Sequence, residues 1–146
     1  MDYKKATSTG FMRLFQYIQG ANAQQKKVEM AAPVLIRIDP GEGPNCESNF
    51  KVNFYFPNAL QSSPTSIPQP TEGSGITITR TPAMKVAVAS YGGWASGDTV
   101  TSHVEALGTA LTADSIKFKP MPYFSAGYDA PFKIFNRHNE VWMLVQ

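Results

Sequence analysis

The sequence predicts an α+β fold in which two amphipathic helices accompany an antiparallel sheet. Two segments carry apolar side chains at helical spacing, and several others alternate apolar and polar residues as half-buried strands do. The order of these segments also repeats, because each half of the chain reads as helix, strand, Ala-Pro turn and strand. With 146 residues, of which 42% are hydrophobic, the chain can bury one core, and we expect a single domain over residues 1–146.

The composition excludes several classes of function. Charged residues make up 16% of the chain and the net charge is +2, so the sequence lacks the basic stripe of a nucleic-acid-binding protein. No apolar run approaches about 18 residues, so we expect no membrane-spanning helix and no membrane partner. With one cysteine, Cys46, and two histidines, His103 and His138, a zinc site of four Cys and His ligands cannot form.

The N-terminus gives an expectation for the compartment. It lacks the apolar stretch of a signal peptide, so the chain taken as written is expected to be cytoplasmic. A signal peptide upstream of Met1 would instead make the protein extracellular.

Two helices are predicted from apolar positions spaced by three and four residues. Gly20 follows the last apolar residue of the first helix and is expected to end it in a left-handed conformation. Asp98 is expected to be the N-cap of the second helix. The apolar faces consist of Phe11, Leu14, Phe15 and Ile18 in the first helix, and of Val100, Val104, Leu107 and Leu111 in the second.

Alternating apolar residues predict the strands. The clearest strand covers residues 50–56, and the last, 140–145, is apolar on both faces, as is typical of a central or doubly covered strand. A turn at 39–44 and a long exposed loop at 58–75 are predicted from their content of Pro, Gly and small polar residues. The other predicted strands cover residues 28–30, 34–38, 76–78 with 84–88, and 122–128.

The two halves of the chain share sequence as well as order. The stretch APVLI at 32–36 matches APFKI at 130–134. A β-α-β-β unit present twice explains the order of the elements, except that the first copy lacks its opening strand. A sheet without that strand exposes unpaired backbone groups. We therefore expect an N-terminally truncated chain, and the alternative is a divergent but complete protein.

Several motifs, in order along nearly the whole chain, resemble the SOUL or haem-binding-protein family. The matching stretches are GFMRLFQYIQG at 10–20, MAAPV at 30–34, YGGW at 91–94, SAGYDAPF at 125–132 and NRHNEVW at 136–142. The resemblance implies a twisted antiparallel β-barrel with two flanking helices, built from two β-α-β-β pseudo-repeats. The strands that the family carries before the first helix are absent here, and Ala31 stands where the family often has Thr.

This resemblance implies non-covalent binding of haem or related tetrapyrroles, as a carrier, a buffer or a sensor. The family's proposed apolar site lies near the first helix and the turn before the final strand. Met12 lies off the main apolar face and is favoured as a ligand contact, whereas the other helix residues also fit an ordinary core. The corresponding positions here are Phe11, Met12, Phe15, Ile18 and residues 136–139.

A haem site needs cations for the propionates and can add an axial iron ligand. Arg13, Lys27 and Arg137 are candidates for the propionates. His138 is either an axial ligand or a solvated turn histidine, so haem bound without an axial protein ligand stays open as well. His103 either flanks a pocket or forms a hydrogen bond at the edge of the core.

Two other functions compete with haem binding. A protein-interaction module would use the pocket or an open sheet edge to bind a partner peptide by strand addition. A hydrolytic enzyme is the other alternative, but the sequence contains no Gly-x-Ser-x-Gly elbow, no P-loop and no complete dinucleotide fingerprint. We therefore expect a binding protein rather than an enzyme.

Overall fold

The computed structural model describes residues 3–41 and 48–146. Cys46 and the second half of the predicted turn at 39–44 lie outside the described residues. None of the described helices is long and apolar enough to cross a membrane. The elements in chain order are α1 (Tyr3–Ile18), β1 (Val34–Asp39), β2 (Asn49–Asn53), α2 (Asn58–Gln61), the 3-10 helix η1 (Pro64–Ser66), β3 (Val86–Tyr91), α3 (Gly97–Ala113), β4 (Phe118–Gly127) and β5 (Asn139–Val145).

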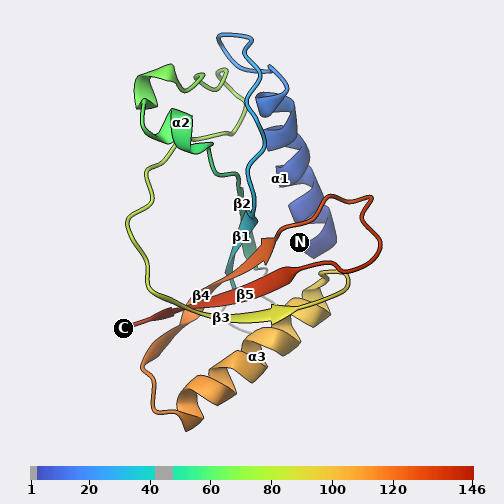
Figure 1. Cartoon of the computed structure of the whole chain (residues 1–146), viewed down its shortest axis with the longest axis vertical. Coiled ribbons are helices and arrows are strands. Elements are labelled where there is room, and N and C mark those ends of the chain that lie inside the picture. The colour runs from blue at the N-terminus through green and yellow to red at the C-terminus, as the bar shows by residue number, and fades with distance from the viewer. Residues whose placement is uncertain (1–2, 42–47) are drawn as a thin grey trace.

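The strands form one five-stranded antiparallel sheet in the order β2-β1-β4-β5-β3. The predicted α+β class is therefore confirmed. The predicted barrel is wrong for this chain, because a barrel requires its edge strands to pair. Within the described residues β2 and β3 each pair on one side only, and the sheet stays open (Figure 1). β5 pairs with β4 and β3, as expected for a central strand.

Both long helices cover the same face of the sheet. The apolar side of α3 packs on β5, β3 and β4, as its spacing predicts, with alternate residues of β5 facing the helix. α1 reaches the same face through Tyr3, which packs against this core, and through its contact with β2. The buried centre consists of Ile38, Val100, Val104, Leu111, Val141 and Met143. The opposite face carries a smaller cluster of Leu35, Phe124 and Ala126.

α1 packs against β2 at a point where only glycine fits. A Cβ atom on Gly10 would lie 2.6 Å from Cγ2 of Val52, far inside van der Waals contact. This close approach brings the ring of Phe11 against that of Phe54, with centroids 5.2 Å apart. The helix ends at Ile18 as predicted, and Gly20 follows it with φ of +115°.

The link between β2 and β3 contains residues 58–75, which the sequence predicts as one long exposed loop. α2 and η1 interrupt it, and Pro68 is buried, with its carbonyl accepting a hydrogen bond from the hydroxyl of Tyr17. After η1 the chain arches away from the sheet before it returns to β3 (Figure 1). The second core, between α1 and this link, contains Tyr17, Ile18 and Val28 with Phe15, Phe54, Phe56, Leu60 and Ile76.

Residues 28–30, predicted as a strand, form none, because nearby backbone groups bond to the end of α1 instead. The side-chain amide of Asn22 donates to the carbonyls of Tyr17 and Lys26, and the N–H of Val28 donates to the carbonyl of Ile18. These bonds fold the link back onto the helix. Residues 54–56, 76–78 and 84–85 also lie outside the strands.

The matched Ala-Pro stretches occupy different places in the two halves. Ala32–Pro33 precedes β1, whereas Ala130–Pro131 lies between β4 and β5. The prediction that both halves read helix, strand, Ala-Pro turn and strand is therefore wrong, because the strand expected before Ala32 does not form. What the halves share is a helix followed by two antiparallel strands.

Ser96, and not Asp98, is the N-cap of α3. The Oγ of Ser96 accepts a hydrogen bond from the N–H of Thr99 at 3.2 Å. In return, Oγ1 of Thr99 accepts one from the N–H of Ser96 at 2.8 Å. This reciprocal pair satisfies two N–H groups at the start of the helix. Asp98 lies within the first turn, where its charge faces the positive end of the helix dipole.

Candidate functional site

α1 directs its aromatic residues inward and leaves Met12 outside. Phe11 and Phe15 are half-buried and stacked, with ring centroids 5.8 Å apart. Ile18 is 4% exposed and belongs to the second core, so its side chain supports the helix from inside. Met12 is 49% exposed. Among the four apolar residues that the sequence singled out on this helix, Met12 is therefore the most accessible to a ligand.

Arg13 lies on the exposed side of α1, next to the link that follows η1. It borders a small hollow of about 150 Å³ formed with residues of that link. Among the described residues, no acidic side chain forms an ion pair with Arg13. Lys27 is exposed in the segment after α1. Both cations are accessible to an anionic ligand.

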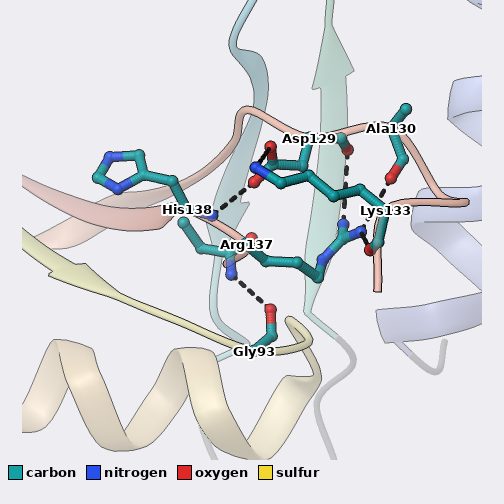
Figure 2. A network of polar contacts seen from close by, with 7 residues as sticks. Gly93, Asp129, Ala130, Lys133, Arg137 and His138 are labelled. Atoms are coloured by element: carbon teal, nitrogen blue, oxygen red, sulfur yellow. Dashed lines mark hydrogen bonds and ion pairs between the residues drawn. The ribbon is translucent and has the colours of Figure 1, made fainter. Parts of the chain in front are cut away.

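The segment 128–138, which we call the β4–β5 loop, is held by a network of polar contacts (Figure 2). Nη1 of Arg137 donates to the carbonyls of Ala130 and Lys133 at 2.9 and 2.7 Å, and Nη2 donates to that of Asp129 at 3.5 Å. The guanidinium carbon lies 4.2 Å from the centre of the Trp94 ring. Arg137, predicted as a partner of the propionates, is thus engaged within its own loop.

Asp129 closes the same loop from its other end. Its carboxylate accepts hydrogen bonds from Nζ of Lys133 and from the N–H of His138, each at 2.5 Å (Figure 2). These bonds, with that of Lys133 first, hold the pKa of Asp129 below its ordinary value. The side-chain amide of Asn139 donates to the carbonyl of Gly93 at 2.9 Å, which ties the base of the loop to the turn before α3.

The β4–β5 loop carries an exposed apolar patch that sequence reasoning missed. Phe132, Ile134 and Phe135 are 86, 66 and 79% exposed. Exposed groups of large apolar side chains are common at surfaces that bind a ligand or another protein. The signal in the sequence was that three of the four residues between Pro131 and Asn136 are large and apolar. We call these three residues the apolar loop patch.

His138 is the last residue of the β4–β5 loop, and its side chain is hydrogen-bonded to the last strand. Its Nε2 lies 2.8 Å from Oε1 of Glu140, and its ring packs edge-on against Tyr128. Glu140 also accepts hydrogen bonds from the hydroxyl of Tyr128 and the indole N–H of Trp142, at 2.8 and 2.7 Å. Nε2, one of the two ring nitrogens that a haem iron could take, is therefore already engaged with a carboxylate.

This cluster shifts the titration of two of its members. Burial would raise the pKa of Glu140, but the hydrogen bonds from His138, Trp142 and Tyr128 outweigh it and hold that pKa below its ordinary value. Burial first, and then the carboxylate of Glu140, raises the pKa of Tyr128 to about 12. Glu140 is thus stabilised as a carboxylate on the sheet face that the helices leave uncovered.

His103 takes the second of the two roles that its sequence position allowed. Its ring stacks on Tyr91, with centroids 4.1 Å apart, and its Nδ1 lies 2.7 Å from the carbonyl oxygen of Thr99. It is thus a hydrogen-bonded histidine at the edge of the core. In the part of the chain that the structure describes, no group of three or more His, Cys, Asp or Glu residues could hold a metal ion.

The β4–β5 loop and the start of α1 lie at the same end of the molecule. Trp94 underlies Arg137, and three residues later a Cβ on Gly97 would lie 3.4 Å from Cβ of Tyr3, at the start of α1. Figure 1 shows the loop passing beside this helix. Across residues 3–41 and 48–146, no hydrogen bond, ion pair or aromatic contact joins the loop to the four apolar site residues of α1.

Matches to known proteins cover nearly the whole chain. A family model described as SOUL heme-binding protein matches residues 1–144. The chain is 38% identical to heme-binding protein 2 of Homo sapiens over 144 residues, which cover 99% of this chain and 68% of that protein. It is 31% identical to heme-binding protein 1 of Xenopus laevis over 142 residues, which cover 97% and 72%.

The fold and these matches define an α+β protein whose relatives are named for binding rather than for catalysis. The chain belongs to the SOUL heme-binding protein family, as its motifs indicated.

Proposed function

We propose that this chain binds haem or a related tetrapyrrole without a covalent bond, on the surface between α1 and the β4–β5 loop. The observation that carries the proposal is the apolar loop patch, whose Phe132 is 86% exposed on a loop fixed by Arg137. An ordered loop loses little conformational entropy on binding, so the burial of its rings against a flat apolar ligand is retained as affinity. Reversible binding of this kind suits a carrier, a buffer or a sensor.

The residues of α1 fit the other edge of such a ligand. Met12 is exposed, and Phe11 lies beside it with Phe15 and Phe54 packed behind it. With a rise of about 1.5 Å per residue, Met12 lies about 13 Å along the helix from Tyr3, which is at the loop end of the molecule. That distance is comparable to the width of a substituted tetrapyrrole. Ile18 contributes by holding the helix in the core.

The cations and the histidine take different roles in this proposal. Arg13 and Lys27 are exposed and would meet the propionates, whereas Arg137 would hold the loop in shape. The backbone N–H of His138 would help to hold the loop through its hydrogen bond to Asp129, and Nε2 of its ring would remain bonded to Glu140. We therefore propose a haem held by apolar contacts and rim cations, without His138 as an axial ligand. The bound haem would supply its iron and its Soret absorption.

Hemin titration tests the proposal. We expect a saturable Soret shift at about one haem per chain. A double substitution, Phe132→Ser with Phe135→Ser, should weaken binding at least about tenfold, because burial of one aromatic side chain contributes about 1.5–3 kcal/mol. Ile116→Ser is the matched control: Ile116 is 43% exposed but follows α3, at the far end from the loop, and its loss should leave the titration unchanged.

Two outcomes would contradict this proposal. Binding that never saturates, or that the double substitution leaves intact, would indicate adsorption to apolar surface elsewhere. A change in the position of the Soret band on His138→Ala would show that His138 coordinates the iron after all.

A further inference from the structure

A groove far from the β4–β5 loop runs between α3 and the start of β4. Its volume is about 680 Å³, and the groove is shallow and widely open to solvent. α3 extends beneath the sheet away from the loop (Figure 1). The lining residues of α3 run from Val104 to Ala113, so the groove lies toward the C-terminal end of this helix. Apolar side chains form most of its wall, including Val104 of α3, Phe118 and Pro120 of β4, and Met143 of β5.

Gly108 lies in the middle of α3 and lines this groove without a structural need for glycine. A Cβ at this position would lie 3.7 Å from the Phe118 ring and 3.9 Å from the end of Met143, which is ordinary contact. Gly10 differs, because a Cβ there would collide with Val52 at 2.6 Å. Alanine at 108 would favour the helix, since glycine is the poorest helix former after proline. The glycine therefore keeps the groove deeper than packing or helix stability requires.

The lining residues also limit the charge of a ligand that the groove could bind. Among the described lining residues only Glu105 is ionisable, and residues 97–113 contain no lysine or arginine. Thr109 and Thr112 donate their hydroxyl hydrogens to the helix carbonyls of Glu105 and Gly108 at 3.0 and 2.8 Å, so they offer the groove lone pairs and no donor. The described lining side chains can therefore accept a hydrogen bond or meet a positive charge, and none of them can bind a carboxylate.

We propose that this groove is a second ligand site, selective for a compact apolar amine. The ring of the amine would lie over Gly108 against Phe118 and Met143, and its ammonium group would meet the carboxylate of Glu105. A dianionic tetrapyrrole is the opposite kind of ligand, so this site is separate from the haem surface and does not depend on it.

A matched series of three naphthalenes tests the charge selection. 2-Naphthylmethylamine, 2-naphthylmethanol and 2-naphthoate share one ring system and carry a positive, a neutral and a negative group at neutral pH. We expect the amine to bind about two- to fivefold more tightly than the alcohol, the range of an exposed ion pair, and the naphthoate to bind most weakly. Isothermal titration and saturation-transfer NMR measure the three affinities. Glu105→Gln should reduce the affinity for the amine to that for the alcohol.

Substitution of Gly108 tests the location. Gly108→Leu should fill the groove and abolish binding of all three compounds, and Gly108→Ala should weaken it while raising the melting temperature. Hemin titration of the same variants should be unchanged, so that the groove proposal and the haem proposal can be tested separately. The proposal would be overturned if the amine and the naphthoate bound equally, or if the unmodified chain bound none of the compounds. It would also be overturned if binding survived in folded Gly108→Leu, or if Gly108→Ala bound at full strength.

Discussion

One arginine organises the loop that carries the apolar patch. Arg137 reaches three carbonyl oxygens of its own loop and stacks on Trp94. Lysine could not replace it, because a single ammonium group has neither the planar fork nor the stacking face of a guanidinium. The sequence identified Arg137 as a cation near the turn, but its acceptors are backbone atoms whose positions depend on the folded loop. Residue type alone could therefore not distinguish a haem contact from a loop support.

Two tyrosine hydroxyls that differ in their hydrogen bonding give a prediction at the residue scale. The hydroxyl of Tyr91 is buried near those of Ser125 and Thr99 but forms no hydrogen bond of good geometry among the described residues, whereas that of Tyr17 donates to the buried carbonyl of Pro68. Tyr91→Phe should leave the free energy of unfolding unchanged or raise it by up to about 1 kcal/mol, because an unsatisfied polar group is removed. Tyr17→Phe should lower it by about 1–3 kcal/mol, since the carbonyl loses its partner.

Urea unfolding of both variants measures the difference between them. Phenylalanine keeps the ring in each case, including the stack of residue 91 on His103. The packing of the ring is therefore the same before and after each substitution, and only the hydroxyl is lost. A loss for Tyr91→Phe equal to that for Tyr17→Phe would mean that the hydroxyl of Tyr91 has a partner after all.

At the scale of elements, periodicity predicted the helices better than the strands. Helical spacing is a local property, so α1 and α3 lie where their apolar residues indicated. A strand also needs a partner, and local hydrogen bonds can compete for its backbone. Asn22 supplies that competition for residues 28–30, which alternate like a strand and yet fold back on α1. The partner of a strand cannot be found from the strand's own sequence.

The start of α3 gives a prediction at the element scale. Ser96→Ala should lower the free energy of unfolding by about 1 kcal/mol, because the N–H of Thr99 loses its acceptor and the reciprocal bond is weakened. Asp98→Asn should cost less, about 0.3–0.5 kcal/mol, since it removes only a favourable charge from the first turn. Thermal melting followed by circular dichroism at low salt compares the two. A larger loss for Asp98→Asn would restore it as the cap.

At the scale of the whole molecule, the sheet has one face covered by helices and one largely uncovered. Residues of the second face include Val88, which is 45% exposed, and the bonded set of Tyr128, Glu140 and Trp142. The sequence could predict an antiparallel sheet, because alternation and element order suffice for that. Whether the edges of the sheet close into a barrel depends on which strands meet, and the barrel expectation rested on resemblance alone.

The carboxylates of Glu140 and Asp129 give a prediction at the scale of the whole molecule, which is that the folded chain loses stability at acid pH. Both have a pKa held below its ordinary value, by hydrogen bonds from His138, Trp142 and Tyr128 for Glu140 and from Lys133 and His138 for Asp129. A carboxyl group with a lowered folded pKa stabilises the fold above its unfolded pKa and loses this effect as pH falls through the folded value. The melting temperature should therefore hold between pH 7 and about pH 5 and fall below that. Glu140→Gln should lower the melting temperature at pH 7. It should also reduce the fall of the melting temperature below about pH 5 (the acid limb), because glutamine does not titrate. Glu29→Gln, at an exposed position after α1, should leave the limb unchanged. Melting curves at half-unit steps of pH measure this, and an acid limb as steep in Glu140→Gln as in the unmodified chain would exclude Glu140 as its source.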